Sequence, residues 1–175
     1  MNKSQLKKIG LNVFRVLSFI AILPVLAALM FWLTNCRLNL SPSSPVGIWK
    51  INELSSVEKD AYVLVDSYWD KEGIKRGIHK NGMSPMIKKV VGLPGELVEK
   101  KDACVYISGE KITGSKIAEK GKDGTPSPKV GYPYVIPEDS FYVMSDKEGG
   151  WDSRYFGPVP RTVMLNRATL VWRWK

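Results

Sequence analysis

The chain has 175 residues, of which 44% are hydrophobic and 25% charged, with a formal net charge of +9. This composition is ordinary for a folded protein and excludes a disordered or collagen-like chain. Residues 1–50 contain six of the 26 basic residues and none of the 17 acidic ones, so the other 125 residues carry a net charge of only +3. Because the basic excess lies at the N-terminus, it argues against a nucleic-acid-binding domain.

The first predicted element is an apolar segment between Arg15 and Arg37 that contains 21 uncharged residues. As a helix it spans roughly 30 Å, which matches the hydrocarbon core of a bilayer. We predict a cytoplasmic basic tail at 1–15 and a transmembrane helix at 16–35. Pro24 lies within this helix, where a membrane tolerates it.

The basic residues around this segment predict its orientation. Four precede it and only Arg37 and Lys50 follow it closely, so the positive-inside rule predicts an extracytoplasmic domain at 36–175. The alternatives are a buried helix of a soluble domain and a cleaved signal peptide or lipoprotein leader. Two features argue against a signal peptide. The apolar run is too long, and it ends in bulky residues at 30–33, where a cleavage site needs small ones. Asn35 fits a lipoprotein cleavage box poorly.

After the anchor, the apolar runs become short and rich in β-branched and aromatic residues, with turn-forming clusters between them. The runs are Tyr62 to Val65, Met86 to Val91, Cys104 to Ile107, Tyr134 to Ile136, Phe141 to Met144 and Thr169 to Trp172. They predict a mainly β, antiparallel domain, in the form of a distorted barrel or sandwich. Residues 112–131 are predicted to form a long surface loop.

The first segment of chemical interest runs from Asn39 to Trp49. Pro42 and Pro45 fix φ and hold the intervening serines in an extended backbone with exposed hydroxyls. By composition alone, however, this segment is a Ser/Pro linker.

The second segment, Met86 to Glu96, contains two adjacent lysines in a predicted strand. Because side chains alternate along a strand, Lys88 shares a face with Met86 and Val90, whereas Lys89 points the other way. One lysine must therefore lie among apolar residues. Either its stem snorkels to the surface, or burial lowers its pKa and leaves a neutral amine able to accept a proton.

The third segment, Trp151 to Pro158, has Asp152 and Arg154 two positions apart. Side chains at this spacing can face the same way, and we predict an ion pair that fixes a loop.

Ordinary hydrolase templates do not fit this sequence. A Ser-His-Asp triad needs an imidazole, but the single histidine, His79, lies in a polar, loop-like stretch and is interpreted as a surface residue. We find no metal-ligand motif or phosphate-binding glycine loop and predict neither metal nor cofactor. Cys36 and Cys104 are the only cysteines, and the sequence leaves open whether they pair. A serine with lysine as its base is the template that remains.

Together these segments resemble the type I signal peptidases, and more narrowly their TraF-type branch, the conjugative-transfer signal peptidases. The resemblance rests on the apolar anchor, a serine before a proline, Lys-Lys-Val-Val-Gly-Leu-Pro-Gly-Glu at 88–96 and Asp-Ser-Arg-Tyr-Phe-Gly at 152–157. It covers nearly the whole chain from residue 39. The lysine and Asp-Ser-Arg-Tyr segments are highly specific in combination, whereas the serine segment alone is weak.

The resemblance implies roles for five residues. Ser43, two residues before a proline, would be the nucleophile, and Lys88 would be its general base. The Ser41 hydroxyl and the Ser43 backbone N–H would bind the oxyanion. Asp152 and Arg154 would support the lysine.

The sequence departs from the family pattern at two positions. Ser44 occupies a position where the family usually has methionine or isoleucine, so it stays a second candidate for the nucleophile. Gly150 stands where some relatives have a serine near the lysine, so we expect that supporting hydroxyl to be missing.

The implied function is that of a single-pass serine endopeptidase of the inner, cytoplasmic membrane with a periplasmic or extracytoplasmic domain. It would cleave signal peptides, leader peptides or pilin precursors in conjugative transfer. Its partners would be an extended precursor peptide, from a pilin or a secreted preprotein, and membrane lipid, with no nucleic acid. In TraF-type relatives the trimmed pilin can also be cyclised. The alternative is a non-catalytic, membrane-tethered β domain that scaffolds a secretion or conjugation apparatus, but the presence of both Ser43 and Lys88 favours the enzyme.

Overall fold

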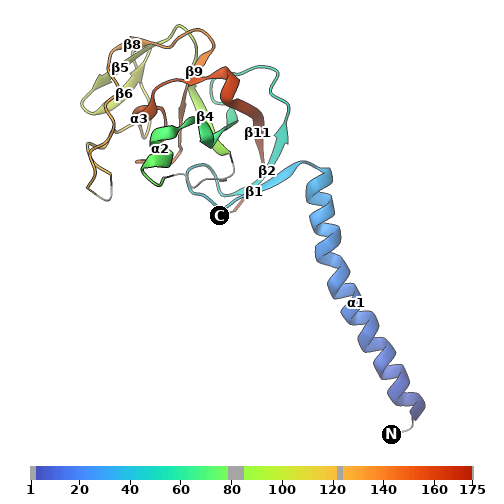
Figure 1. Ribbon diagram of the computed structural model, residues 1–175. Coiled ribbons are helices and arrows are strands. Elements are labelled where there is room, and N and C mark those ends of the chain that lie inside the picture. Colours follow the sequence, from blue (N-terminus) through green and yellow to red (C-terminus); the bar gives the residue numbers. More distant parts are fainter. Residues whose placement is uncertain (1–2, 79–84, 122–123, 175) are drawn as a thin grey trace. The chain divides into compact units, whose positions relative to one another are not determined.

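The computed structural model describes residues 3–78, 85–121 and 124–174. The chain divides into two compact units, Met1–Arg37 and Leu38–Lys175. The first consists mainly of one long helix, and the second contains nearly all of the strands (Figure 1).

The first unit is dominated by helix α1 (Lys3–Leu33), which contains Pro24. Within its Lys7–Leu33 part, an 18-residue window has a mean hydropathy of 2.6. Among the described residues, this is the one helix long and apolar enough to cross a membrane. The helix begins well before residue 16 and includes most of the predicted tail, because the isolated Gly10 weakens a helix without ending it. Apolar side chains along it, such as Trp32 at 75%, are exposed.

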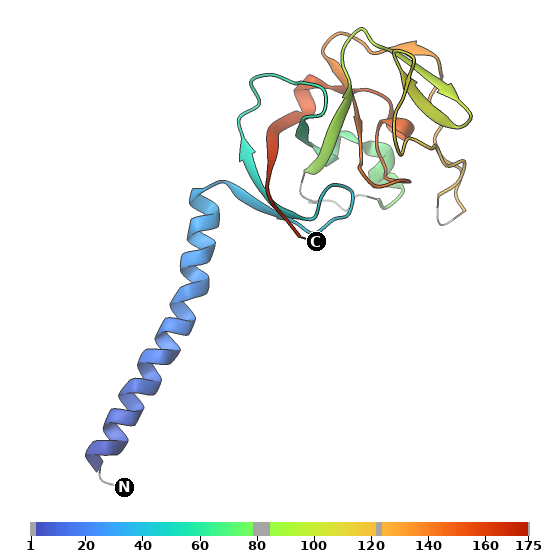
Figure 2. The same cartoon turned by 180° about the vertical axis from the view of Figure 1, so that it is seen from behind.

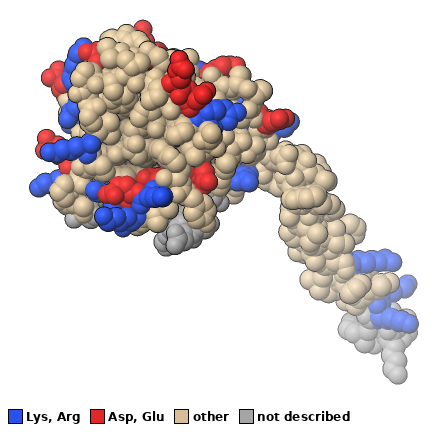
Figure 3. All heavy atoms as spheres, turned by 45° about the horizontal axis from the view of Figure 1, so that its top comes forward, with Lys and Arg blue, Asp and Glu red and all other residues tan. Residues whose placement is uncertain are grey.

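Charge is distributed differently in the two units. Lysine and arginine gather near the N-terminal end of α1 (Figure 3), in a region of the sequence that has no acidic residue. On the face of the second unit shown there, basic and acidic side chains are interspersed. Within that view, no single-sign surface of the kind that binds nucleic acid is visible on the second unit.

Two antiparallel sheets build the second unit (Figures 1 and 2). The larger consists of β1 (Cys36–Asn39), β2 (Gly47–Asn52), β3 (Tyr62–Val65), β4 (Met86–Gly92), β9 (Ser140–Met144), β10 (Val159–Pro160) and β11 (Met164–Arg173). Its order is β1-β2-β11-β3-β4-β9-β10. The smaller consists of β5 (Leu97–Lys101), β6 (Cys104–Ile107), β7 (Glu110–Lys111) and β8 (Tyr134–Val135), in the order β7-β6-β5-β8.

The helical segments of this unit are short. They are α2 (Lys71–Lys75), α3 (Ser153–Phe156) and the 3-10 helices Ser67–Trp69 and Arg161–Val163. The mainly β prediction is confirmed, and every predicted apolar run overlaps a strand.

Five strands were not predicted, namely β1, β2, β5, β7 and β10. Among the predicted strands, the largest difference is at β11. It was expected from Thr169 to Trp172 but runs from Met164 to Arg173. Its first residues alternate between buried and more exposed positions rather than forming an apolar run, and pairing with β3 extends the strand there. The predicted loop at 112–131 contains one isolated bridge in its described part, between Lys120 and Pro126. His79 lies outside the described residues.

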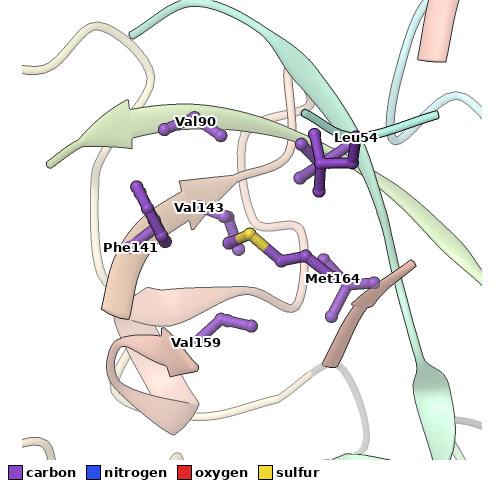
Figure 4. Close-up of a cluster of buried hydrophobic side chains, with 8 residues drawn as sticks. Leu54, Val90, Phe141, Val143, Val159 and Met164 are labelled. Atoms are coloured by element: carbon purple, nitrogen blue, oxygen red, sulfur yellow. The ribbon is translucent and has the colours of Figure 1, made fainter. Parts of the chain in front are cut away.

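Adjacent residues of β4 belong to two different hydrophobic clusters. Val90 belongs to the first and Val91 to the second. The first cluster, shown in Figure 4, consists of Leu54, Val63, Val65, Val90, Phe141, Val143, Val159 and Met164. Burial of each such side chain contributes about 1.5–3 kcal/mol. This packing on both faces makes β4 a rigid support for Lys88, which shares the Val90 face of the strand.

Candidate active site

The side chain of Asn39 holds the serine segment between β1 and β2. Its Nδ2 lies 2.9 Å from the Ser41 carbonyl O, 3.0 Å from Ser44 Oγ and 3.1 Å from the Pro45 carbonyl O. Its Oδ1 accepts the Ser41 N–H at 3.1 Å. The fully buried Trp49 donates its indole N–H to the same Pro45 carbonyl at 3.0 Å. The segment is therefore a hydrogen-bonded turn, not the extended Ser/Pro linker that composition predicts.

This turn distinguishes the two candidate serines. Ser44 is 2% exposed, and its Oγ accepts from Asn39. Ser43 is only half-buried, and its Oγ lies 2.9 Å from Ser41 Oγ. Its N–H also points to Ser41 Oγ, at a long 3.4 Å. The geometry favours Ser43 over Ser44 as the hydroxyl that a substrate can reach.

Lys88 is the buried lysine of β4. Its side chain is 4% exposed, and Nζ donates to Ser145 Oγ and to the Trp151 carbonyl O, both at 2.7 Å. Lys89 instead forms an ion pair with Asp60 at 2.8 Å and keeps a third of its side chain exposed. The prediction that strand alternation buries one of the two lysines is confirmed, and that residue is Lys88.

The surroundings of Lys88 disfavour its charged form. Burial is the main cause that lowers its pKa from 10.5 to about 8, and the Arg154 guanidinium acts in the same direction. The carboxylates of Asp152 and Asp70 oppose this shift. At pH 7 about a tenth of the Lys88 amines are then neutral, against roughly one in three thousand for an ordinary lysine.

Asp152 and Arg154 form the predicted ion pair. Their side chains are fully buried, and Arg154 Nη2 lies 2.7 Å from Asp152 Oδ2. The same carboxylate accepts the Ser145 N–H at 2.9 Å. The guanidinium also donates to the backbone carbonyls of Gly114, Lys116 and Gly150, at 3.0 Å each. The pair therefore ties the 114–116 segment to the segment after β9 that contacts Lys88.

One expectation about this region was wrong. Gly150 has no hydroxyl to offer Lys88, as expected, but Ser145 supplies one from another position. A Cβ added to Gly150 would lie 2.5 Å from Ser145 Cβ, so the two positions cannot both carry a side chain without movement. Sequence reasoning missed Ser145 because only the pairing of Met144 with Lys89 brings the following residue next to Lys88.

The serine turn and the lysine surroundings are connected at residues 145 and 146. Ser145 accepts from Lys88, and the next N–H, that of Asp146, donates to the Ser43 carbonyl O at 2.9 Å. Within the described residues, no hydrogen bond joins Ser43 directly to Lys88. Catalytic hydrogen bonds are often long in ligand-free proteins and tighten only when substrate is present.

A pocket of about 440 Å³ adjoins the serine turn. Ser44, Tyr62, Asp146 and Arg173 contribute its polar side chains, and Pro42, Pro45, Val46 and Trp174 complete its lining. The Tyr62 hydroxyl donates to both oxygens of Asp146, at 3.1 and 2.9 Å. Burial and this neighbouring carboxylate raise the pKa of Tyr62, so the phenol stays protonated. The pocket is therefore lined by polar and apolar side chains together and lies directly beside the turn.

Residues 11–174 match the family described as signal peptidase, peptidase S26. The match spans most of the chain, which therefore belongs to this peptidase family. The predicted family resemblance is confirmed.

The relatives that resemble this chain include proteins of conjugation. It is 34% identical over 153 residues to the conjugal transfer protein TraF of Agrobacterium tumefaciens (strain 15955), covering 78% of this chain and 81% of the relative. It is 31% identical to the plasmid transfer protein TraF of Escherichia coli, covering 81% of this chain and 86% of the relative. A probable signal peptidase I-2 of Synechocystis sp. (strain ATCC 27184 / PCC 6803 / Kazusa) is 31% identical over 68% of this chain and 54% of its own. These similarities support a signal-peptidase-like function in conjugation.

Proposed function

We propose that this chain is a membrane-anchored serine endopeptidase that cleaves leader segments from precursor proteins, with Ser43 as nucleophile and Lys88 as general base. The observation that carries the proposal is the state of Lys88. Lys88 is 4% exposed, donates to two acceptors and has a pKa lowered to about 8. Such a lysine is suited to exchange protons near neutral pH.

Acylation begins when the neutral Lys88 amine accepts the proton of Ser43 Oγ and this oxygen attacks the carbonyl carbon of the scissile peptide bond. The Ser43 N–H and the Ser41 hydroxyl both donate to the oxyanion. These two hydrogen bonds replace the long 3.4 Å contact between the Ser43 N–H and Ser41 Oγ. One such donor typically contributes about 3 kcal/mol to the transition state. The tetrahedral intermediate collapses as the Lys88 ammonium protonates the leaving amine. This step leaves an ester on Ser43.

Deacylation uses the same base. Lys88, again neutral, accepts a proton from a water molecule that attacks the ester carbonyl. The second tetrahedral intermediate expels the Ser43 oxygen, which recovers its proton from Lys88. The products are the leader with a new carboxyl terminus and the mature protein with a new amino terminus.

The proposal assigns α1 as the membrane anchor. After Arg15 this helix has no charged residue, and a side chain such as Phe19, which is 71% exposed, is stable in hydrocarbon rather than in water. The basic residues at its start would remain in the cytoplasm and the β unit would lie outside. The TraF relatives suggest a pilin precursor or another secreted preprotein as substrate, which would bind as an extended strand.

The test is incubation of the detergent-solubilised full chain with prepilin and preprotein candidates, followed by mass measurement of the products. We expect Ser43→Ala and Lys88→Ala to abolish cleavage. Lys89→Ala is the matched control, because it removes a neighbouring lysine whose ammonium is paired with Asp60 at the surface. We expect it to cleave normally.

Full cleavage by Ser43→Ala would contradict the assignment and point to Ser44. No cleavage of any precursor by the wild type would instead favour the non-catalytic scaffold. A product mass lower by one further water would indicate that the trimmed peptide is cyclised.

A further inference from the structure

Asp70 is a buried carboxylate that the proposed reaction does not use. It is 3% exposed and lies at the N-terminus of α2. Its Oδ1 accepts the Gly73 N–H at 2.9 Å, which caps this short helix. Its Oδ2 accepts a hydrogen bond from the indole N–H of Trp151, in a segment more than 80 residues away. Capping explains one oxygen of Asp70 but not the second.

Trp151 connects this carboxylate to the lysine. Its ring stacks on Tyr155 with a centroid distance of 5.3 Å and an interplanar angle of 6°. The Arg76 guanidinium lies 5.8 Å from the centroid of the same ring. The backbone carbonyl of Trp151 accepts from Lys88 Nζ at 2.7 Å. Anchoring the ring therefore also anchors a hydrogen-bond acceptor of Lys88.

Two glycines precede this carbonyl, and Gly150 is held by hydrogen bonds to the Lys147 carbonyl and from Arg154. Gly149 and Gly150 come directly before Trp151, and Gly149 has a φ of 72°. Glycine allows the widest range of backbone conformations, so such a segment needs side-chain contacts to keep one geometry. Arg154 supplies one such contact at Gly150, and the hydrogen bond to Asp70 and the stacking on Tyr155 supply those at Trp151 itself.

The orientation of the amine depends on its two acceptors. A neutral lysine amine has two N–H bonds and one lone pair. Ser145 Oγ and the Trp151 carbonyl, each at 2.7 Å, occupy both N–H bonds, which leaves the lone pair in one direction for the serine proton. If the Trp151 carbonyl moves, the amine can rotate about its Cε–Nζ bond and this direction is lost.

We propose that Asp70 is a positioning residue for the reaction, which holds the Trp151 carbonyl in place through the indole and thereby orients the Lys88 amine. This inference rests on the proposed Ser43–Lys88 chemistry. It gives α2 and its N-terminal carboxylate a role in the active site although neither touches the substrate.

Asp70 also acts on Lys88 through its charge. Among the described residues, the charged groups that shift the pKa of Lys88 most are Asp152, Arg154 and Asp70, and the last raises this pKa. Removing the charge of Asp70 therefore lowers this pKa, while Asp152 and Arg154 remain. The acid limb of the pH–rate profile should then move to lower pH.

The experiment compares kcat/KM against pH for three variants of the full chain in detergent, with a precursor peptide that the wild type cleaves. Asp70→Asn keeps a good helix cap but cannot accept at both positions at once. We expect the plateau of its kcat/KM profile to fall about tenfold, which is less than the roughly 100-fold cost of a 1 Å misplacement. We also expect the acid limb of this profile to move to lower pH. Trp151→Phe keeps an aromatic ring and the charge of Asp70 but loses the N–H, so its plateau of kcat/KM should fall while its acid limb moves less than that of Asp70→Asn.

Asp66→Asn is the matched control. Asp66 caps the neighbouring 3-10 helix by accepting the Tyr68 N–H at 2.9 Å, four residues before Asp70. We expect this variant to keep the wild-type plateau and acid limb. Thermal melts establish that each variant is folded at the assay temperature, and rates are compared per folded molecule.

Two results would overturn the inference while leaving the proposed function intact. One is an Asp70→Asn variant with the wild-type plateau and acid limb, and the other is an equal loss in Asp66→Asn, which would indicate a general effect of helix capping. The proposed function fails separately, if Ser43→Ala or Lys88→Ala still cleaves the same peptide.

Discussion

Replacing Lys88 by methionine is expected to change how the stability of the folded chain depends on pH. The folded-state pKa of Lys88 is lowered to about 8, whereas the unfolded chain keeps the ordinary value of 10.5. Between these values the unfolded chain binds more protons, so the contribution of Lys88 to stability increases as pH rises. Below about pH 8 both states are protonated and the full penalty of burying the ammonium, about 3 kcal/mol, is present.

Methionine is similar in size and has no proton to lose, so its variant lacks this contribution. The stability of the wild type relative to Lys88→Met should therefore rise by about 2 kcal/mol between pH 7.5 and 9.5. Burial raises the pKa values of Tyr62, Tyr134 and Tyr142, which gives the opposite trend as pH approaches 10. That trend is common to both proteins and cancels in the difference.

The assay is urea unfolding of the full chain in non-ionic detergent, followed by tryptophan fluorescence at several pH values. The absolute difference at one pH is less informative, because methionine leaves Ser145 Oγ and the Trp151 carbonyl without their donor. Lys89→Met is the control, because it removes a lysine of the same strand that keeps a third of its side chain exposed, and the rise of about 2 kcal/mol should be specific to Lys88→Met. A constant difference for Lys88→Met would refute the idea that burial lowers the pKa of Lys88.

Two further predictions concern the same site. The kcat/KM of the wild type should fall about tenfold for each pH unit below about 8, because only the neutral amine of Lys88 accepts a proton; a profile that is flat down to mildly acid pH would argue against lysine as the base. Gly150→Ser should cost about 1–3 kcal/mol of unfolding free energy, because its Cβ would lie 2.5 Å from that of Ser145. Adding Ser145→Gly should recover most of this loss in the same urea titrations, and a single variant as stable as the wild type would show that the loop simply moves aside.

The sequence was most informative where function depends on residues that are close along the chain. Alternation along one strand was enough to predict that a lysine at 88 or 89 is buried, and the structure buries Lys88. The spacing of Asp152 and Arg154 likewise predicted an ion pair within one short segment. The apolar run before residue 37 predicted a long helix by its length alone, and α1 is that helix.

The cysteines show the limit of such local reasoning. Spacing left open whether Cys36 and Cys104 pair, and both are free thiols in the structure. Composition alone also could not distinguish Ser43 from Ser44, and only the resemblance to the peptidase family favoured Ser43. Only the fold of the turn around Asn39 makes one hydroxyl buried and the other accessible.

By itself, therefore, the sequence determined the long apolar helix, the mainly β domain and the peptidase family. It also determined which residues of β4 lie on the same face of the strand as Lys88. These features depend on composition, on periodicity and on motifs within a few residues of one another. The tertiary structure decided which groups face the Lys88 amine: Ser145 from the end of β9, the Trp151 carbonyl, and behind it Asp70 from the start of α2. These residues come from three segments that only sheet pairing and loop packing bring together, so no local pattern in the sequence indicates their contact.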